Sequence, residues 1–219
     1  MTNTQPIAPL DPAQTAIVAV DFQHDVIGAD GAFAAMFHAE VERVGVIPAT
    51  VRLLRAARTT GAKIVYSRAT FSRGYPELVG NIPILAHTAE YGCLVDGTPG
   101  AAVIDAVKPH DSDLVVAHHR VSCFHGTELD VVLRGAGVDT IVLAGVATNL
   151  AVESTARAGG DLGYRTLVVA DACSTTTRAA HEASLESLSM LAQVVSVDQL
   201  CAALSSGLRR SGDRVAATG

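Results

Sequence analysis

The stretch GVDTIVLAGVATNLAVEST, residues 137–155, places a short apolar run directly before a segment with helical spacing. Residues 140–144 (TIVLA) are mostly β-branched and aliphatic, which is typical of a short buried strand. From Asn149 to Gly160 the apolar residues recur at spacings of three and four, which indicates an amphipathic helix. The stretch therefore predicts a strand, a tight turn and a helix in succession.

The same alternation runs through the rest of the chain. Five more short apolar runs are predicted strands: Ala16–Val20, Lys63–Tyr66, Leu114–Ala117, Leu167–Ala170 and Gln193–Val197. Three more segments have helical spacing: Val41–Thr60, Glu128–Gly135 and Arg178–Leu191. The runs are nearly continuously apolar and do not alternate strictly, as in strands that are covered on both faces. We therefore predict an α/β fold, a three-layer doubly wound sheet of six mainly parallel strands.

The chain of 219 residues is long enough to bury one substantial core. We expect a flexible N-terminal lead over residues 1–12, a single domain over 13–206 and a flexible tail over 207–219. Residues 71–111, rich in Gly, Pro, His and Tyr, break the rhythm of strands and helices, and are expected to form part of a pocket wall.

The composition excludes several classes of partner. The formal net charge is −6 and no basic patch is present, which argues against nucleic acid. No apolar run reaches the ~18 residues that a membrane span needs. The N-terminal residues lack the pattern of a signal peptide, so a cytoplasmic protein with reduced cysteines is expected. A small molecule is the expected partner.

Parallel α/β sheets bind ligands beyond the carboxyl ends of their strands, and this rule selects the candidate site. Asp21 follows the first predicted strand, His118 and His119 end the third, and residues 145–151 end the fourth. A carboxylate directly after a buried strand is costly unless it is paired or used. Asp21 is therefore a functional candidate, with a turn cap as the alternative.

The two histidines are adjacent, so their side chains diverge if the chain is extended there, and at most one should face Asp21. A histidine beside a carboxylate exchanges protons near neutral pH. The alternative is an ordinary loop histidine. DFQHD (residues 21–25) has too few suitably spaced ligands for a good metal site, so no metal and no cofactor is expected.

The turn before Asn149 has the properties of an oxyanion site. Backbone N–H groups at the start of a helix favour negative charge. A thiol at position 151 would be an activated nucleophile there, but Ala151 offers only a methyl group.

Four stretches together resemble the isochorismatase-like hydrolase superfamily, also called the cysteine hydrolases: AVDFQ (19–23), RVSCFHGTELDVVLR (120–134), GVDTIVLAGVATNLAVEST (137–155) and GYRTLVVADACST (163–175). The resemblance covers about Ala16 to Leu200. It implies a Rossmann-like sheet of six parallel strands and a homodimer or homotetramer. It also implies hydrolysis of a small molecule: an amide, a carbamoyl compound or nicotinamide in members with the cysteine, and the vinyl ether of isochorismate in others.

Most of that family uses an Asp, a Lys and a Cys. By resemblance the Asp is Asp21, but the Lys position holds His118 and the Cys position holds Ala151. The resemblance also implies a cis peptide bond between Val146 and Ala147, and an oxyanion hole formed by the N–H groups of Ala147 and residue 151. The substrate is expected against these residues and four others: Phe22, Gln23, Phe124 and Thr148. Four aromatic or imidazole side chains are further candidates for the pocket wall: Phe33, Phe37, His87 and Tyr91.

A methyl group cannot attack a carbonyl, so covalent catalysis through residue 151 is excluded. The preferred interpretation is hydrolysis of a C–N bond, amide or carbamoyl, by water that Asp21 and His118 activate. Three alternatives stay open: vinyl-ether hydrolysis with Asp21 as proton donor, a relocated nucleophile at Cys123, and a homologue that binds a ligand without turnover. An engineered Cys-to-Ala change would explain Ala151 but not His118.

Overall fold

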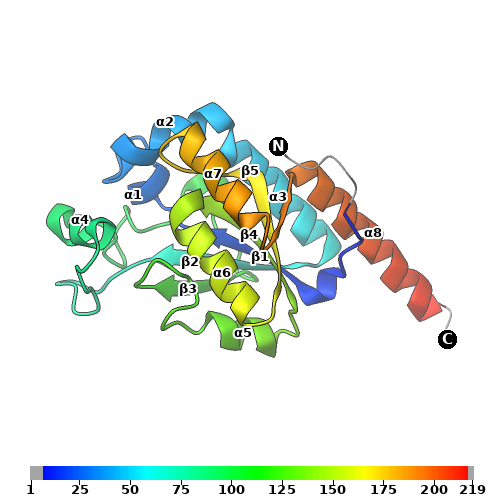
Figure 1. The fold of residues 1–219 in the computed structure, drawn as a ribbon. Helices are drawn as coiled ribbons and strands as arrows, with labels where there is room; N and C mark the ends of the chain where they lie inside the picture. Colours follow the sequence, from blue (N-terminus) through cyan, green and yellow to red (C-terminus); the bar gives the residue numbers. More distant parts are fainter. Residues whose placement is uncertain (1–6, 217–219) are drawn as a thin grey trace.

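The computed structural model of the chain describes residues 7–216, with side chains up to residue 209. Six parallel strands form one sheet in the order β3-β2-β1-β4-β5-β6 (Figure 1). They are β1 (Thr15–Val20), β2 (Lys63–Ala69), β3 (Leu114–His118), β4 (Thr140–Val146), β5 (Arg165–Ser174) and β6 (Gln193–Val195). The predicted doubly wound sheet is confirmed, and all its strands are parallel.

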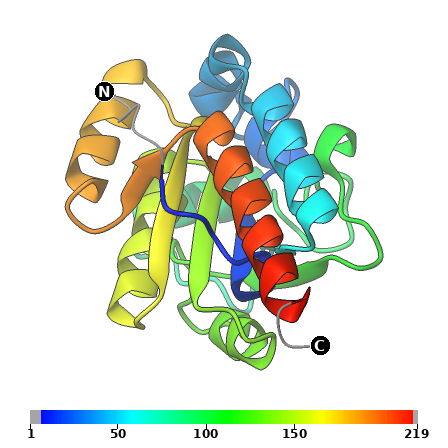
Figure 2. The same cartoon turned by 90° about the vertical axis from the view of Figure 1, so that its right-hand side faces the viewer.

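Alternate residues of each strand face opposite layers of helices. In β1, Ile17 and Ala19 belong to one apolar cluster, and Ala16, Val18 and Val20 belong to the other. The first cluster is covered by α2 (Ala34–Val44), α3 (Val46–Thr60) and α8 (Val197–Ala216), and α3 and α8 lie side by side (Figure 2). The second is covered by α5 (Leu129–Gly135), α6 (Glu153–Asp161) and α7 (Arg178–Leu188). Both faces of the central strands β1 and β4 are thus buried, which explains their continuous apolar runs, whereas most residues of the edge strand β3 are exposed.

Two predicted helices are divided in the structure. The segment predicted over 41–60 is split because Gly45 adopts a left-handed conformation (φ 74°) between α2 and α3. The helix predicted from Asn149 begins as a π-helical turn, η3 (Thr148–Val152), and continues as α6. The strand predicted to reach Val197 ends at Val195, because Val197 already begins α8.

Parts of both predicted flexible ends make contacts or form helix in the structure. Leu10 is buried, and its N–H donates to the carbonyl of Ala203 in α8 (3.2 Å). The helix α8 continues through the predicted boundary at 207 to Ala216. A methyl group at Gly207 would lie 1.7 Å from the carbonyl oxygen of Leu10, so glycine permits this close approach. Residues 1–6 and 217–219 lie outside the described part of the chain.

The segment after β2 provides one wall of a cavity, as predicted for 71–111. It contains α4 (Pro83–Tyr91) and η2 (Asp105–Val107); the remaining short helices are η1 (Pro12–Gln14) and α1 (His24–Ile27). Figure 1 shows α1, α2 and α4 at the end of the sheet where β1, β2 and β3 finish. Within residues 7–216 no helix combines the length and the hydropathy of a membrane span.

The strand order places a topological switch point between β1 and β4. From β1 the chain builds the sheet outward through β2 to β3, and it then returns to β4 and builds outward on the other side. Ligands of doubly wound sheets bind at this crevice, beyond the carboxyl ends of the two central strands. In this chain the crevice lies between Asp21 and the turn at Val146.

Candidate active site

Asp21 directly follows β1 with a left-handed backbone (φ 56°), which is uncommon for a residue other than glycine. Its N–H donates to the carbonyl of Ser67 (3.0 Å), which continues the pairing of β1 with β2. Its carboxylate oxygen Oδ1 accepts from the N–H of Ala69 (3.0 Å). The side chain is buried and its position is fixed by the end of β2.

His118 pairs with the same carboxylate oxygen. Parallel registry sets His118 of β3 beside Ala69 of β2, and Nε2 of His118 lies 2.8 Å from Oδ1 of Asp21. The other ring nitrogen, Nδ1, lies 2.6 Å from the carbonyl oxygen of Arg120. A carbonyl can only accept, so Nδ1 carries a proton and both ring nitrogens are engaged.

Burial by itself lowers the pKa of His118, but the charge and hydrogen bond of Asp21, together with the carbonyl of Arg120, outweigh it and raise that pKa above its ordinary value. An imidazolium beside a carboxylate is therefore favoured near neutral pH. The second carboxylate oxygen of Asp21, Oδ2, has no hydrogen-bond partner among the described residues, and Asp21 lines the cavity. Oδ2 is thus the atom of the pair that can act on a ligand.

The turn after β4 has the geometry that the resemblance implies. The peptide bond between Val146 and Ala147 is cis. Gly145 precedes it at φ 144°, and a methyl group there would lie 2.0 Å from the carbonyl oxygen of Val20. The carbonyl of Ala147 accepts from the N–H groups of Leu150 (3.1 Å) and Val152 (3.2 Å), which starts η3.

Neighbouring elements hold this turn in place. The hydroxyl of Thr148 lies 2.8 Å from Nδ1 of His181 in α7, and the hydroxyl of Ser184 donates to the carbonyl of Thr148 (3.3 Å). The side chain of Asn149 accepts from the hydroxyl of Thr175 (2.5 Å), which follows β5. The backbone of the turn is therefore held by contacts to α7 and to the residue after β5.

One cavity of about 80 Å³ joins Asp21, His118 and the turn. Its lining is mainly apolar: Asp21, Val26, Phe33, Phe37, Ala69, Phe71, Ile84, Leu85, Thr88, Leu94, His118, His119, Arg120, Val121, Val146, Ala147, Leu150 and Ala151. All three predicted catalytic positions, and the predicted oxyanion residues Val146 and Ala147, thus face one space. Of the predicted wall residues Phe33 and Phe37 line it, whereas His87 and Tyr91 stack on each other beside Phe33.

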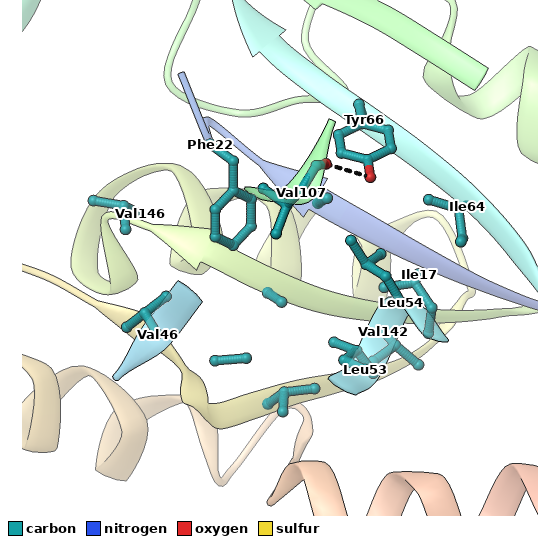
Figure 3. Packing of buried hydrophobic residues seen from close by; sticks show 14 of the residues in the cluster. Ile17, Phe22, Val46, Leu53, Leu54, Ile64, Tyr66, Val107, Val142 and Val146 are labelled. Carbon is teal, nitrogen blue, oxygen red and sulfur yellow. Dashed lines mark hydrogen bonds between the residues drawn. The ribbon is translucent and has the colours of Figure 1, made fainter. Parts of the chain in front are cut away.

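The other predicted substrate-binding residues do not line this cavity. Phe22 is packed in the core beside Val107 (Figure 3). The amide of Gln23 donates to the carbonyls of Ala69 (2.8 Å) and Ala101 (2.9 Å), so it joins two segments of chain. Phe124 stacks on Tyr164 (5.7 Å), on the opposite face of the sheet. Thr148 supports the turn through its contacts to α7, as described above.

His119 and Arg120 line the cavity although neither was predicted to do so. Only His118 pairs with Asp21, as predicted for at most one of the two histidines, and His119 reaches the cavity wall separately because β3 ends at His118 and the chain bends. Nδ1 of His119 lies 2.6 Å from the carbonyl of Thr70 and so carries a proton, while Nε2 has no hydrogen-bond partner within the part of the chain that the structure describes. The guanidinium of Arg120 donates to Val79 (3.1 Å) and Asn81 (2.9 Å), which ties the segment after β2 to the site. In the sequence, only the run of His118, His119 and Arg120 after a predicted strand indicated these two residues.

The structure offers no support for a relocated cysteine nucleophile. Cys123 is buried, and burial followed by the negative charge of Asp21 raises its thiol pKa to about 12. Burial also raises the pKa of Cys93 to about 11 and that of Cys173 to about 12. No cysteine among residues 7–209 lines the cavity.

The side chains of residues 21–25 (DFQHD) do not gather around a common site. Asp25 accepts from the N–H of Leu94 (2.8 Å), and His24 is exposed. Among the residues with described side chains no three His, Cys, Asp or Glu are grouped as metal ligands.

The isochorismatase domain family matches residues 15–199, nearly the whole ordered fold. The chain belongs to the isochorismatase family. It is 34% identical to the ureidoacrylate amidohydrolase RutB of Methylobacterium radiotolerans over 197 residues, which cover 84% of this chain and 73% of that protein.

Two solved structures superpose on most of the chain. The cysteine hydrolase from Pseudomonas syringae pv. phaseolicola is 27% identical with a TM-score of 0.81, covering 94% of this chain and 100% of that one. The N-carbamoylsarcosine amidase from Thermoplasma acidophilum is also 27% identical, with a TM-score of 0.69, covering 84% of this chain and 97% of that one. Distant homologues of this isochorismatase-family hydrolase therefore include amidohydrolases.

Proposed function

We propose that this isochorismatase-family protein hydrolyses a C–N bond of a small amide or carbamoyl compound with activated water and without a covalent intermediate. The observation that carries the proposal is the 2.8 Å contact between Asp21 and His118 in the wall of the cavity at the switch point. The relatives named as an amidohydrolase and an amidase support cleavage of a C–N bond. The methyl group of Ala151 supports attack by water, because it leaves room where a nucleophilic side chain would stand.

In this mechanism Oδ2 of Asp21 is the general base. It takes a proton from a water molecule as the water oxygen forms a bond to the carbonyl carbon of the substrate. His118 donates to Oδ1 and thereby orients the carboxylate, while its own second nitrogen stays bound to the carbonyl of Arg120. A positioned base of this kind contributes about 10²- to 10⁴-fold to a rate.

The oxyanion of the tetrahedral intermediate is placed at the turn, against the N–H groups of Ala147 and Ala151. Both residues line the cavity, and the turn that carries them is braced by Thr148 and Asn149. Because the donors are preorganised, each is expected to contribute about 10²- to 10³-fold.

Collapse of that intermediate breaks the C–N bond, and the leaving nitrogen must gain a proton. His119 is suited to relay it, because Thr70 holds the proton of its ring on Nδ1 and leaves Nε2 free to accept one at the cavity wall. Nε2 takes up the proton that Asp21 gained from water and passes it to the leaving nitrogen, which returns both residues to their starting state. His118 does not serve in this step, since neither of its ring nitrogens is free.

The test is a hydrolysis screen of the wild-type chain over amides, carbamoyl compounds and isochorismate, with product detected by mass spectrometry. His118→Ala is measured beside His110→Ala, which removes an exposed histidine outside the site. Release of amine or ammonia that falls in His118→Ala and persists in His110→Ala is the expected result.

Turnover of isochorismate alone would replace the proposal with vinyl-ether hydrolysis. Absence of turnover on all three classes would leave a homologue that binds its ligand without catalysis. Activity that is equal in the wild type and in His118→Ala would contradict the assigned role of the pair.

A further inference from the structure

The charged and polar side chains of the cavity gather at one end. His118, His119 and Arg120 are consecutive residues at the end of β3, and Asp21 pairs with the first of them. Other walls come from the segments around α2 and α4, which contribute Phe33, Phe37, Ile84, Leu85 and, as the one polar residue of that set, Thr88.

Thr88 does not make the walls from α2 and α4 polar. Its hydroxyl donates to the carbonyl of Ile84 in the preceding turn of α4 (3.1 Å), so its hydrogen is already used. Leu85 and Phe33 beside it are almost fully buried, at 7% and 3% exposed. A carboxylate or ammonium group placed between α2 and α4 would lose its hydration without gaining an ionic partner, which is strongly unfavourable.

The volume of the cavity also limits the size of the apolar group that can bind. A cavity of about 150 Å³ lined by Leu, Ile and Phe holds benzene. The cavity here is about 80 Å³, roughly half of that. The group that it can bury is therefore smaller than a benzene ring.

From these observations we infer that the substrate is the neutral amide of a short aliphatic acid, with the amide carbon at Asp21 and the turn and a small hydrocarbon group between α2 and α4. The inference rests on the proposed function for the identity of the reacting bond. Beyond that function, it states that the acyl group is uncharged and contains a few carbon atoms.

Binding tests the inference separately from turnover. The wild-type chain is titrated with isobutyramide, succinamate and benzamide, and amide shifts of residues along the cavity wall are followed by two-dimensional NMR. We expect isobutyramide to shift Leu85 and Leu150 and to bind about tenfold or more tightly than succinamate, which has the same amide and an added charge. Benzamide should bind more weakly than isobutyramide.

Phe37→Leu shortens the wall at α2 and should reverse the preference between benzamide and isobutyramide. Its control is Phe124→Leu, the same change in an aromatic residue that packs on Tyr164 away from the cavity. This control should keep the wild-type order and so excludes a general loosening of the core.

The outcomes separate the two proposals. Binding of isobutyramide at the cavity without hydrolysis would uphold a neutral aliphatic amide as the ligand of the cavity and contradict the proposed function. Hydrolysis of succinamate or of another charged compound in preference to isobutyramide would uphold the C–N hydrolase and overturn the neutral aliphatic substrate. Failure of isobutyramide to shift residues of the cavity would also overturn it, as would equal effects of the two Phe→Leu changes.

Discussion

At the scale of single residues, the chemistry depends on which nitrogen and oxygen atoms remain free. Asp21 uses Oδ1 for Ala69 and His118, and His118 uses both ring nitrogens. The free atoms facing the cavity are then Oδ2 of Asp21 and Nε2 of His119. In the proposed mechanism His118 therefore positions the carboxylate, Asp21 is the base, and His119 relays the proton to the leaving group.

The charge of His118 is expected to make stability depend on pH. Its folded pKa is raised above the ordinary value near 6.5, so the contribution of the pair is fully present below that pH and is lost as pH rises through the folded pKa. His118→Gln keeps a donor for Asp21 but removes the charge. We expect its deficit in free energy of unfolding, measured by urea denaturation, to be largest at about pH 6 and to shrink as the pH rises through the folded pKa.

The exposed His110→Gln serves as the control and should show a small deficit that does not change with pH. A deficit of His118→Gln that stayed constant, or grew as pH rose, would contradict the imidazolium assignment.

His119 can be tested with two isosteres. His119→Asn places an amide near Nδ1 and keeps the bond to Thr70, whereas His119→Gln places one near Nε2. If Nε2 protonates the leaving nitrogen, the Asn variant should lose about 10²-fold or more in kcat on an alkyl amide. The loss should be much smaller on a p-nitroanilide, whose leaving group needs less protonation. Equal losses on both substrates would assign His119 to binding instead.

At the scale of elements, the site depends on the turn between β4 and α6. Gly145 permits that turn because only glycine adopts its φ of 144° freely and because a methyl group would meet the carbonyl of Val20 at 2.0 Å. The bracing contacts of Thr148 and Asn149 reach α7 and the end of β5. The close approach to Val20 and the contacts to α7 and the end of β5 therefore both fix the conformation of the turn.

Gly145→Ala should destabilise the chain by about 1–3 kcal/mol from backbone strain alone, as measured by urea denaturation. The matched control is Gly160→Ala, which lies in α6, is exposed and meets no atom within 4 Å. That change should stabilise by up to about 1 kcal/mol, because alanine is the better helix former. Similar behaviour of the two variants would contradict the steric account of the turn.

The contact between α8 and the N-terminal segment is a second element-scale prediction. Gly207→Ala places a methyl group 1.7 Å from the carbonyl of Leu10 and should cost about 1–3 kcal/mol of stability through overpacking. Gly135→Ala in α5, where a methyl group meets nothing within 4 Å, is the control. Equal midpoints in thermal denaturation would mean that residues 7–12 do not pack on α8 in solution.

At the scale of the whole molecule, the order of strands brings the site together. Asp21, His118 and Ala151 are far apart in sequence, but each follows or ends a parallel strand, and parallel strands finish at the same edge. The apolar runs were enough to predict that edge and the residues on it. This is why the catalytic candidates were predictable from the sequence.

Side-chain direction was not predictable in the same way. Gln23 turns to bind Ala101, which is remote in sequence, and Phe22 turns into the core. His119 reaches the cavity because the chain bends after His118, which no local pattern indicated. The helical end of α8 was not predicted because the composition after Gly207 resembles a disordered tail, and the contacts of Ala203 and Gly207 with Leu10 are not visible in the sequence.

The most direct test of the account is kcat/KM of Asp21→Asn relative to the wild type, on the compound that the wild type hydrolyses best. The asparagine keeps the size of the side chain and removes the basic oxygen, so folding is checked independently by circular dichroism. The account predicts a fall of about 10²- to 10⁴-fold with the fold retained. A correctly folded Asp21→Asn variant with undiminished kcat/KM would contradict it.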